Sequence, residues 1–257
     1  MKPLWPLALL LFVAVSGPSR AIELDGVELT LAYGDASSTT GTEGDGVQAL
    51  GAATFSITPQ FDLRFGLSYA EASANIGRSV DVMGLTADAR FHFTDQAYAG
   101  LFTANYFIDL QVLPIEPVFR YSGLFLGYEA GGFSVEAFFG HSDYDNLVPD
   151  GEVMGLSLGY NFGNGFDVHG FANTEDLGGR QLDQRGLGVG YYLDTGGSAP
   201  PVYAHLTASR GDIGTNRIEA LNLGVTIPLG NGAPIHGRRE FAPRAPYVNL
   251  ASQLAEF

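Results

Sequence analysis

Hydrophobic and polar residues alternate along most of this chain with a period of two. The alternation is clearest in three segments, 27–34, 61–70 and 221–229. In the first, valine, leucine and tyrosine occupy the odd positions, and glutamate, threonine, alanine and glycine occupy the even ones. A period of two places successive side chains on opposite faces of an extended strand. Each such segment therefore predicts a β-strand with one apolar and one small or polar face.

The same reading predicts twelve strands, most of them about ten residues long or a little longer, the length with which a tilted strand crosses a bilayer. They lie near 26–35, 46–57, 61–72, 80–93, 97–108, 115–129, 133–143, 152–162, 166–174, 184–194, 201–210 and 217–229. The alternation is weak around Tyr98–Asp109 and Pro114–Tyr121, where two segments could merge or bend.

The connections between these strands alternate between short and long. Turn-like pairs occur at Pro59-Gln60, Asp95-Gln96, Gly131-Gly132 and Asn164-Gly165, and longer polar stretches such as Asp35–Asp45 separate them. Short turns at one end and long loops at the other are typical of barrels of the bacterial outer membrane, with the short turns in the periplasm. The pattern predicts an all-β fold: a transmembrane, antiparallel, up-and-down β-barrel of about 12 strands.

A soluble β-sandwich also strings short strands together, and the apolar face distinguishes the two folds. Here that face carries large aliphatic and aromatic residues on nearly every strand, whereas the other face is dominated by small residues and scattered charges. Aromatic residues such as Tyr33, Phe91 and Tyr160 fall near strand ends, as in interfacial girdles. A lipid-facing belt explains this distribution better than a packed sandwich.

The chain resembles the porin-like outer-membrane β-barrel proteins of Gram-negative bacteria. The resemblance rests on its amino-terminal signal, on the opening strand Gly26–Gly34 and on the closing strand Leu221–Gly230, and it identifies no subfamily. It implies a location in the cell outer membrane, contact with outer-membrane lipid and lipopolysaccharide, and insertion by the barrel-assembly machinery. Whether the barrel is a monomer or a homo-oligomer stays open.

The two ends predict segments outside the barrel. Lys2, an apolar run and the small residues Ser19 and Ala21 predict a secretory signal peptide over 1–21, with a cut after Ser16 as an alternative. The barrel is expected over 22–230. Although Phe257 is aromatic, the residues before it form no apolar face, so 231–257 is predicted to be a periplasmic tail.

The composition narrows the function. The formal net charge is −15, Lys2 is the single lysine, and cysteine is absent. Without residues 1–21, 11 basic residues stand against 28 acidic ones, a net charge of −17. Nucleic-acid binding requires basic surface, so that class is excluded. An acidic interior or acidic loops would attract cations.

The alternation also predicts which charged side chains point into the barrel. These candidate pore-lining residues are Glu28, Asp62, Arg64, Asp88, Arg90, His92, Glu129, Glu136, Asp167 and His169. Many inward glycines, Gly84 and Gly188 among them, suggest room for water. We therefore expect a porin-like channel for passive diffusion of small hydrophilic solutes that prefers cations. The alternative is a closed barrel with a structural or interaction role through its outer loops or its tail.

No constellation of residues indicates catalysis. Outer-membrane phospholipases need a histidine two residues from a serine on the lipid-facing side, and none of the histidines is followed by Ser at that spacing. His141 and Ser142 are adjacent, so on a strand they face opposite sides. No phosphate-binding loop or calcium-loop spacing is present. The sequence predicts no enzyme activity, no metal and no cofactor.

Overall fold

The computed structural model describes twelve strands. The described residues are 22–75, 78–110, 117–144, 150–176, 179–194 and 200–229, so the predicted signal peptide and tail lie outside them. The strands are β1 (Glu23–Ser38), β2 (Glu43–Thr58), β3 (Phe61–Ala74), β4 (Arg78–His92), β5 (Ala97–Leu110), β6 (Val118–Ala130), β7 (Phe133–Asp143), β8 (Gly151–Asn161), β9 (Phe166–Asp176), β10 (Gln181–Leu193), β11 (Val202–Ile213) and β12 (Asn216–Leu229).

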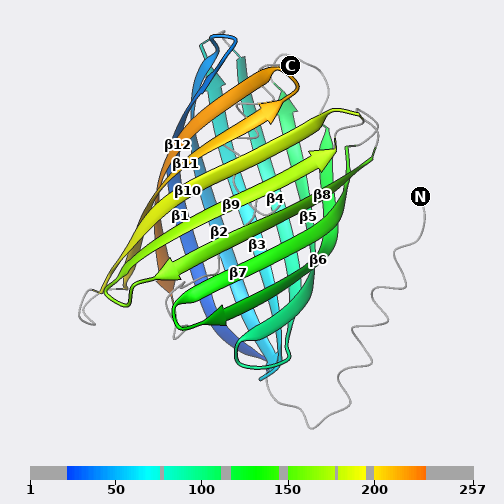
Figure 1. The fold of residues 1–257 in the computed structure, drawn as a ribbon. Coiled ribbons are helices and arrows are strands. Elements are labelled where there is room, and N and C mark those ends of the chain that lie inside the picture. Colours follow the sequence, from blue (N-terminus) through cyan, green and yellow to red (C-terminus); the bar gives the residue numbers. More distant parts are fainter. Residues whose placement is uncertain are drawn as a thin grey trace.

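These strands form one closed antiparallel barrel, whose strongly tilted strands are visible in Figure 1. Each strand pairs with the next along the chain, and β1 pairs with β12 from Val27↔Leu229 to Ser38↔Ile218. The predicted fold class and strand number are confirmed, and β5 and β6 are separate strands. Within the described residues, no helix is long and apolar enough to cross a membrane.

The strands at the loop end are longer than the alternation of apolar residues predicted. The stretch Asp35–Asp45 was expected to be a loop, but β1 continues to Ser38 and β2 starts at Glu43, with Asp35 opposite Asp45. The reason is that the backbone ladder continues where the side chains become polar. The sheet therefore extends past the apolar residues and carries acidic side chains there.

The outer face is a broad apolar belt. Its large side chains are strongly exposed, for example Leu187 at 74% and Leu31 at 68%. Most other strands also contribute to it, with Leu67, Leu101, Leu126, Phe139, Leu158, Leu206 and Leu223 among their exposed residues. A water-soluble protein rarely exposes so many large hydrophobic residues in one continuous band. The belt is the surface of a barrel that is embedded in lipid.

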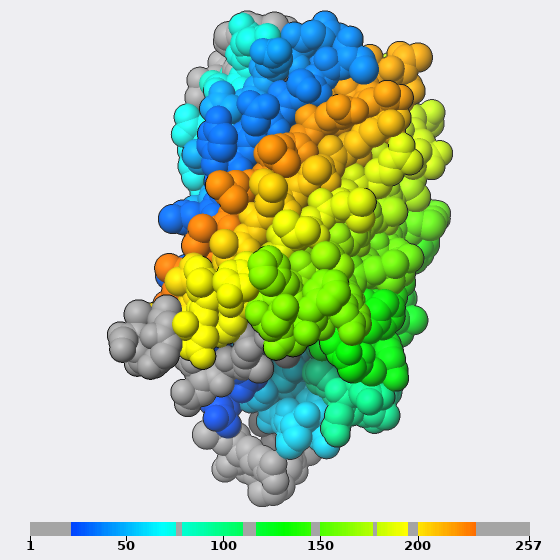
Figure 2. All heavy atoms as spheres, turned by 60° about the vertical axis from the view of Figure 1, so that its left-hand side comes forward, coloured from blue at the N-terminus to red at the C-terminus, as the bar shows by residue number. Residues whose placement is uncertain are grey.

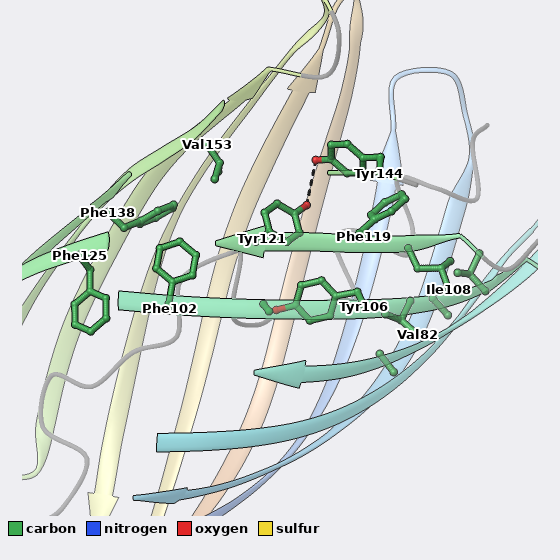
Figure 3. Packing of buried hydrophobic residues seen from close by; sticks show 14 of the residues in the cluster. Val82, Phe102, Tyr106, Ile108, Phe119, Tyr121, Phe125, Phe138, Tyr144 and Val153 are labelled. Atoms are coloured by element: carbon green, nitrogen blue, oxygen red, sulfur yellow. Dashed lines mark hydrogen bonds between the residues drawn. The ribbon is translucent and has the colours of Figure 1, made fainter. Parts of the chain in front are cut away.

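The larger of the two packed apolar clusters in the described interior lies on one side of the barrel and is shown in Figure 3. It is formed by inward-facing residues of β3 to β8 and by Tyr144, which directly follows β7, and its largest members are essentially inaccessible to solvent. The block comprises Ala70, Ala72, Val80, Val82, Tyr98, Phe102, Ala104, Tyr106, Ile108, Phe119, Tyr121, Phe125, Phe138, Tyr144 and Val153. We call this set the aromatic block. It fills one side of the barrel with side chains, as interiors of small barrels commonly are.

The inward glycines do not leave the open space that the sequence suggested. A Cβ on Gly84 would lie 2.7 Å from a ring carbon of Tyr106, and one on Gly188 would meet the ring of His169. Side chains of neighbouring strands cover these glycines, so glycine here permits close packing across the strands. Glycine with an aromatic cover is a recognised pairing in curved sheets.

Replacing Gly84 by valine should therefore destabilise the barrel. The added methyl groups would collide with Tyr106 inside the aromatic block, and overpacking of this kind costs about 1–3 kcal/mol. Gly51 is the matched control, because it faces outward and its added Cβ would lie 3.6 Å from the nearest side-chain atom, on Leu29. Urea unfolding in detergent micelles measures the difference, and equal losses for Gly84→Val and Gly51→Val would contradict the packing described.

Candidate functional site in the barrel interior

The ten charged residues predicted from the alternation lie on the inner face of the barrel, at positions that alternate with the outer belt. They come from β1, β3, β4, β6, β7 and β9. Most are buried or nearly so, and they form small clusters linked by ion pairs. Whether they line a path for solutes stays a prediction.

The first cluster joins β1, β3 and β4. The Arg64 guanidinium lies 3.1 Å from a Glu28 carboxylate oxygen, and Arg64 is opposite Asp88 in the β3–β4 register. The His92 ring nitrogen Nε2 lies 2.8 Å from Asp62, which also accepts a hydrogen bond of 2.8 Å from Ser56. A chain of alternating charges thus crosses three strands. Such pairing reduces the cost of keeping charges away from bulk water.

The second cluster is centred on Arg90 of β4. Its guanidinium carbon lies 4.2 Å above the ring of Tyr98, and its Nη2 is 3.8 Å from Glu136. The Tyr98 hydroxyl donates a 2.8 Å hydrogen bond to the same carboxylate. The guanidinium is also 5.6 Å from the ring centre of Phe125. Arg90 therefore connects the charged interior to the edge of the aromatic block through an ion pair and a cation–π contact. Glu129 is the next-to-last residue of β6, two residues before the turn residue Gly131.

The third cluster lies on β9 and β11, on the other side of the interior. His169 Nδ1 is 3.4 Å from an oxygen of Asp167, and His169 Nε2 is 3.1 Å from the Thr207 hydroxyl. Around these residues the inner face carries the rings of Phe171 and Tyr203 together with small and polar side chains. They include Asn173, Gln184, Ser209 and Asn222 of β9, β10, β11 and β12, all of them partly accessible.

The interior also contains an acidic group that the sequence analysis missed. Glu175 of β9 is buried at 7% exposure, and it accepts hydrogen bonds from the hydroxyl groups of Tyr144 and Tyr121. It was assigned to a loop because the apolar alternation stops before it. Continuing the same even-odd count from Asp167 and His169 would have placed Glu175 on the inner face.

The interior is acidic on balance. Among the inner-face side chains that the structure describes, the carboxylates of Glu28, Asp62, Asp88, Glu129, Glu136, Asp167 and Glu175 outnumber the guanidinium groups of Arg64 and Arg90. Three histidines, His92, His169 and His205, add charge only when they are protonated. Within the described residues, no group of three or more His, Asp or Glu side chains is placed to hold a metal ion. Ser142 faces inward and is fully buried, whereas His141 is exposed on the outer face.

The fold is shared with outer-membrane channels of known structure. An outer-membrane channel from Pseudomonas putida F1 superposes with a TM-score of 0.59 at 11% identity, covering 83% of this chain and 98% of that one. The KdgM porin in complex with disordered oligogalacturonate superposes with a TM-score of 0.56 at 10% identity. The match covers 77% of this chain and 98% of the porin. The translocator domain of the autotransporter NalP from Neisseria meningitidis superposes with a TM-score of 0.50 at 13% identity. The match covers 86% of this chain and 94% of that domain.

By sequence, no family model and no curated protein matches the chain. At identities of 10–13% the structural likeness concerns the fold alone. The closed barrel, its lipid-facing belt and this shared fold define the chain as an outer-membrane β-barrel protein. The predicted resemblance to porin-like barrels and the predicted location in the outer membrane are confirmed, and the subfamily is not determined.

Proposed function

We propose that the protein is an outer-membrane channel for passive diffusion of small hydrophilic solutes, and that it prefers cations. The observation that carries the proposal is the excess of carboxylates over guanidinium groups among the described side chains of the inner face. Fixed charge of one sign inside a low-dielectric wall concentrates ions of the opposite sign. The KdgM porin and the Pseudomonas putida F1 outer-membrane channel, which share the fold, support the same class of function.

The path that we propose follows the polar side of the barrel. The aromatic block occupies the side of β3 to β8, so water and ions would pass along β9 to β12 and β1. Many inner residues there are small, hydroxylated or amide-bearing, and side chains such as Asn173, Thr207 and Asn222 are partly accessible, although Phe171, Leu182 and Ile218 also face inward. Such groups can replace part of the hydration of a passing solute.

The test is the reversal potential of the refolded, signal-free protein in a planar lipid bilayer under a KCl gradient. We expect conductance steps whose reversal potential is shifted from zero toward the equilibrium potential of potassium. No steps from protein that is verifiably folded, by its heat-dependent mobility on a gel, would refute the channel. Steps without preference for potassium would refute the cation preference alone.

Neutralising one interior carboxylate should weaken the preference. Asp167 is suitable because it lies on the β9 side of the interior, along the proposed path, where it faces the His169 ring at 3.4 Å. A unit charge about 10 Å from an ion in water contributes about 0.4 kcal/mol, which is about a factor of two for each ion. Because the same charge attracts potassium and repels chloride, the potassium-to-chloride permeability ratio should fall about fourfold. Glu152→Gln is the control, because Glu152 is exposed on the outer face of β8. Equal changes from both variants would contradict an interior selectivity site.

A further inference from the structure

The lipid-facing surface is not smooth, and one groove in it differs from the rest of the belt. Two adjoining hollows, of about 830 Å³ and about 640 Å³, lie on the outer face between β7 and β1. They share Leu158, Gly170, Leu187, Ala208 and Leu221, so they form one continuous groove. Figure 2 shows part of this face, where β9 to β12 run obliquely side by side and meet β1.

The groove exists because small residues interrupt the belt at neighbouring positions. Gly170 and Ala172 of β9 and Ala208 of β11 point outward, beside leucines of β8, β10 and β12. In the register, Leu158 and Leu187 flank Gly170, and their side chains form the walls. Most of the accessible lining is apolar, so the groove suits a hydrocarbon chain rather than a polar ligand.

The two ends of the groove differ in chemistry. Toward the short-turn end it is bordered by Phe133 and Tyr160, in the region of the aromatic girdle. Toward the loop end it reaches the guanidinium groups of Arg185 and Arg210. The loop end of such barrels faces the outside of the cell, so the arginines lie on the side of the outer leaflet. A lipid with its head group at this end and its chain along the groove matches both ends.

The two arginines at the loop end, Arg185 and Arg210, favour binding of an anion. Arg185 and Arg210 are directly opposite each other in the β10–β11 register, and like charges at such positions repel. Arg210 is neutralised by Asp212, at 2.8 Å, which also binds Arg217 at 3.2 Å. Arg185 forms no ion pair with another described residue, although it is exposed beside the apolar groove.

Acidic groups restrict where the anion can lie. Asp35 and Glu219 line the opposite, β12–β1 side of the same hollow, and Asp183 is two residues before Arg185 on the same face. A phosphate group would therefore sit on the β10 side, against Arg185. An uncompensated arginine within or beside a lipid belt is costly, and a phosphate there supplies charge and hydrogen-bond acceptors at once.

From these observations we propose that the groove is a binding site for a phosphorylated lipid of the outer leaflet, namely lipopolysaccharide. Its lipid phosphate contacts Arg185, with Arg210 next to it, and one acyl chain lies along the groove over Gly170 and Ala208. The site is separate from the barrel interior, so it does not depend on the proposed channel function. It would anchor one lipid in a fixed orientation beside β9 to β11, in contrast to the exchangeable lipids around the remaining belt.

The experiment measures binding of purified lipopolysaccharide to the refolded, signal-free protein in detergent by native mass spectrometry, with titration. Arg185→Gln removes the charge and Ala208→Leu fills the groove, and each is expected to weaken binding about tenfold, the effect of losing one charge-assisted contact or one buried methylene pair. Arg120→Gln and Ala49→Leu are the matched controls, because Arg120 is a partly exposed arginine of β6 that does not line the groove and Ala49 faces outward on β2. The controls should bind as the unmodified chain does.

Several results would overturn the proposal. Unchanged binding by both Arg185→Gln and Ala208→Leu would show that the groove is not the site. If inorganic phosphate displaced lipopolysaccharide as well as unlabelled lipopolysaccharide does, the site would be a simple anion site and not a lipid site. Cysteines placed at Ala208 test for a second copy of the chain. If they cross-link two lipid-free copies into a dimer, the groove is an interface between copies of the chain. Protein that conducts normally but binds no lipopolysaccharide would refute this inference and leave the channel proposal intact.

Discussion

Arg90→Ala is expected to lower the free energy of unfolding by about 3–5 kcal/mol, the usual cost of removing one partner of a buried ion pair. Glu136 would stay buried, at 7% exposure, without the guanidinium that faces it at 3.8 Å. The cation–π contact with Tyr98 would also be lost. Because the Tyr98 hydroxyl remains bonded to Glu136, the loss should stay at the lower end of that range.

The matched control for this result is Arg120→Ala. Arg120 pairs with Asp143 at 3.3 Å, but both side chains are more than 40% exposed, and exposed pairs contribute roughly 0–1 kcal/mol. Urea unfolding in micelles, followed by far-ultraviolet circular dichroism, gives the free energy of unfolding of both variants. If Arg90→Ala and Arg120→Ala were equally mild, Arg90 would not be the structural centre of the second cluster.

The second large effect concerns the aromatic block. Removing the Phe102 and Tyr106 side chains together should raise the single-channel conductance, because both rings fill the interior at 5% and 0% exposure. Each truncation should also cost about 3–5 kcal/mol in stability through the cavity that it leaves. The double variant is therefore to be recorded at low temperature, after its folded state has been checked by its mobility on a gel.

Leu101→Ala provides the comparison for the conductance measurement. Leu101 precedes Phe102 on β5, but its side chain is 61% exposed on the lipid face, so its removal should leave the conductance unchanged. An unchanged conductance in the Phe102→Ala, Tyr106→Ala variant would mean that the aromatic block does not limit the path. A closed barrel that stays silent in both variants would favour the alternative structural or interaction role.

The sequence predicted the barrel well because one side of each strand must meet lipid. This requirement produces strict alternation in segments such as 27–34 and 221–229, and the register of β1 with β12 follows it. The alternation failed where the interior is also apolar. On β5, Leu101 and Phe102 are both large, one facing lipid and the other the aromatic block, so period-two contrast disappears there.

The site was predictable only in part, for a related reason. Orientation follows from position in a strand, which placed residues such as Arg64 and Asp167 on the inner face. Contacts across the barrel depend on side-chain length and rotamer, which a strand pattern does not encode. The stacking of Arg90 on Tyr98 and the bonds from Tyr144 to Glu175 are of this kind. The glycines misled the prediction, because space at one position is filled from a neighbouring strand.

The one-sided position of the aromatic block has a consequence for the order in which the protein assembles. Its residues come from β3 to β8, which are consecutive along the chain and joined by local hairpins. A curved sheet of these six strands can bury its own core before the barrel is closed. The pairing of β1 with β12 joins the most distant parts of the chain, and such non-local contacts form late. We therefore expect the seam between β1 and β12 to be the last ladder to close. Among the described residues, little more than a small cluster of Ala36, Ile218 and Ala220 packs behind this seam, so we also expect it to open first.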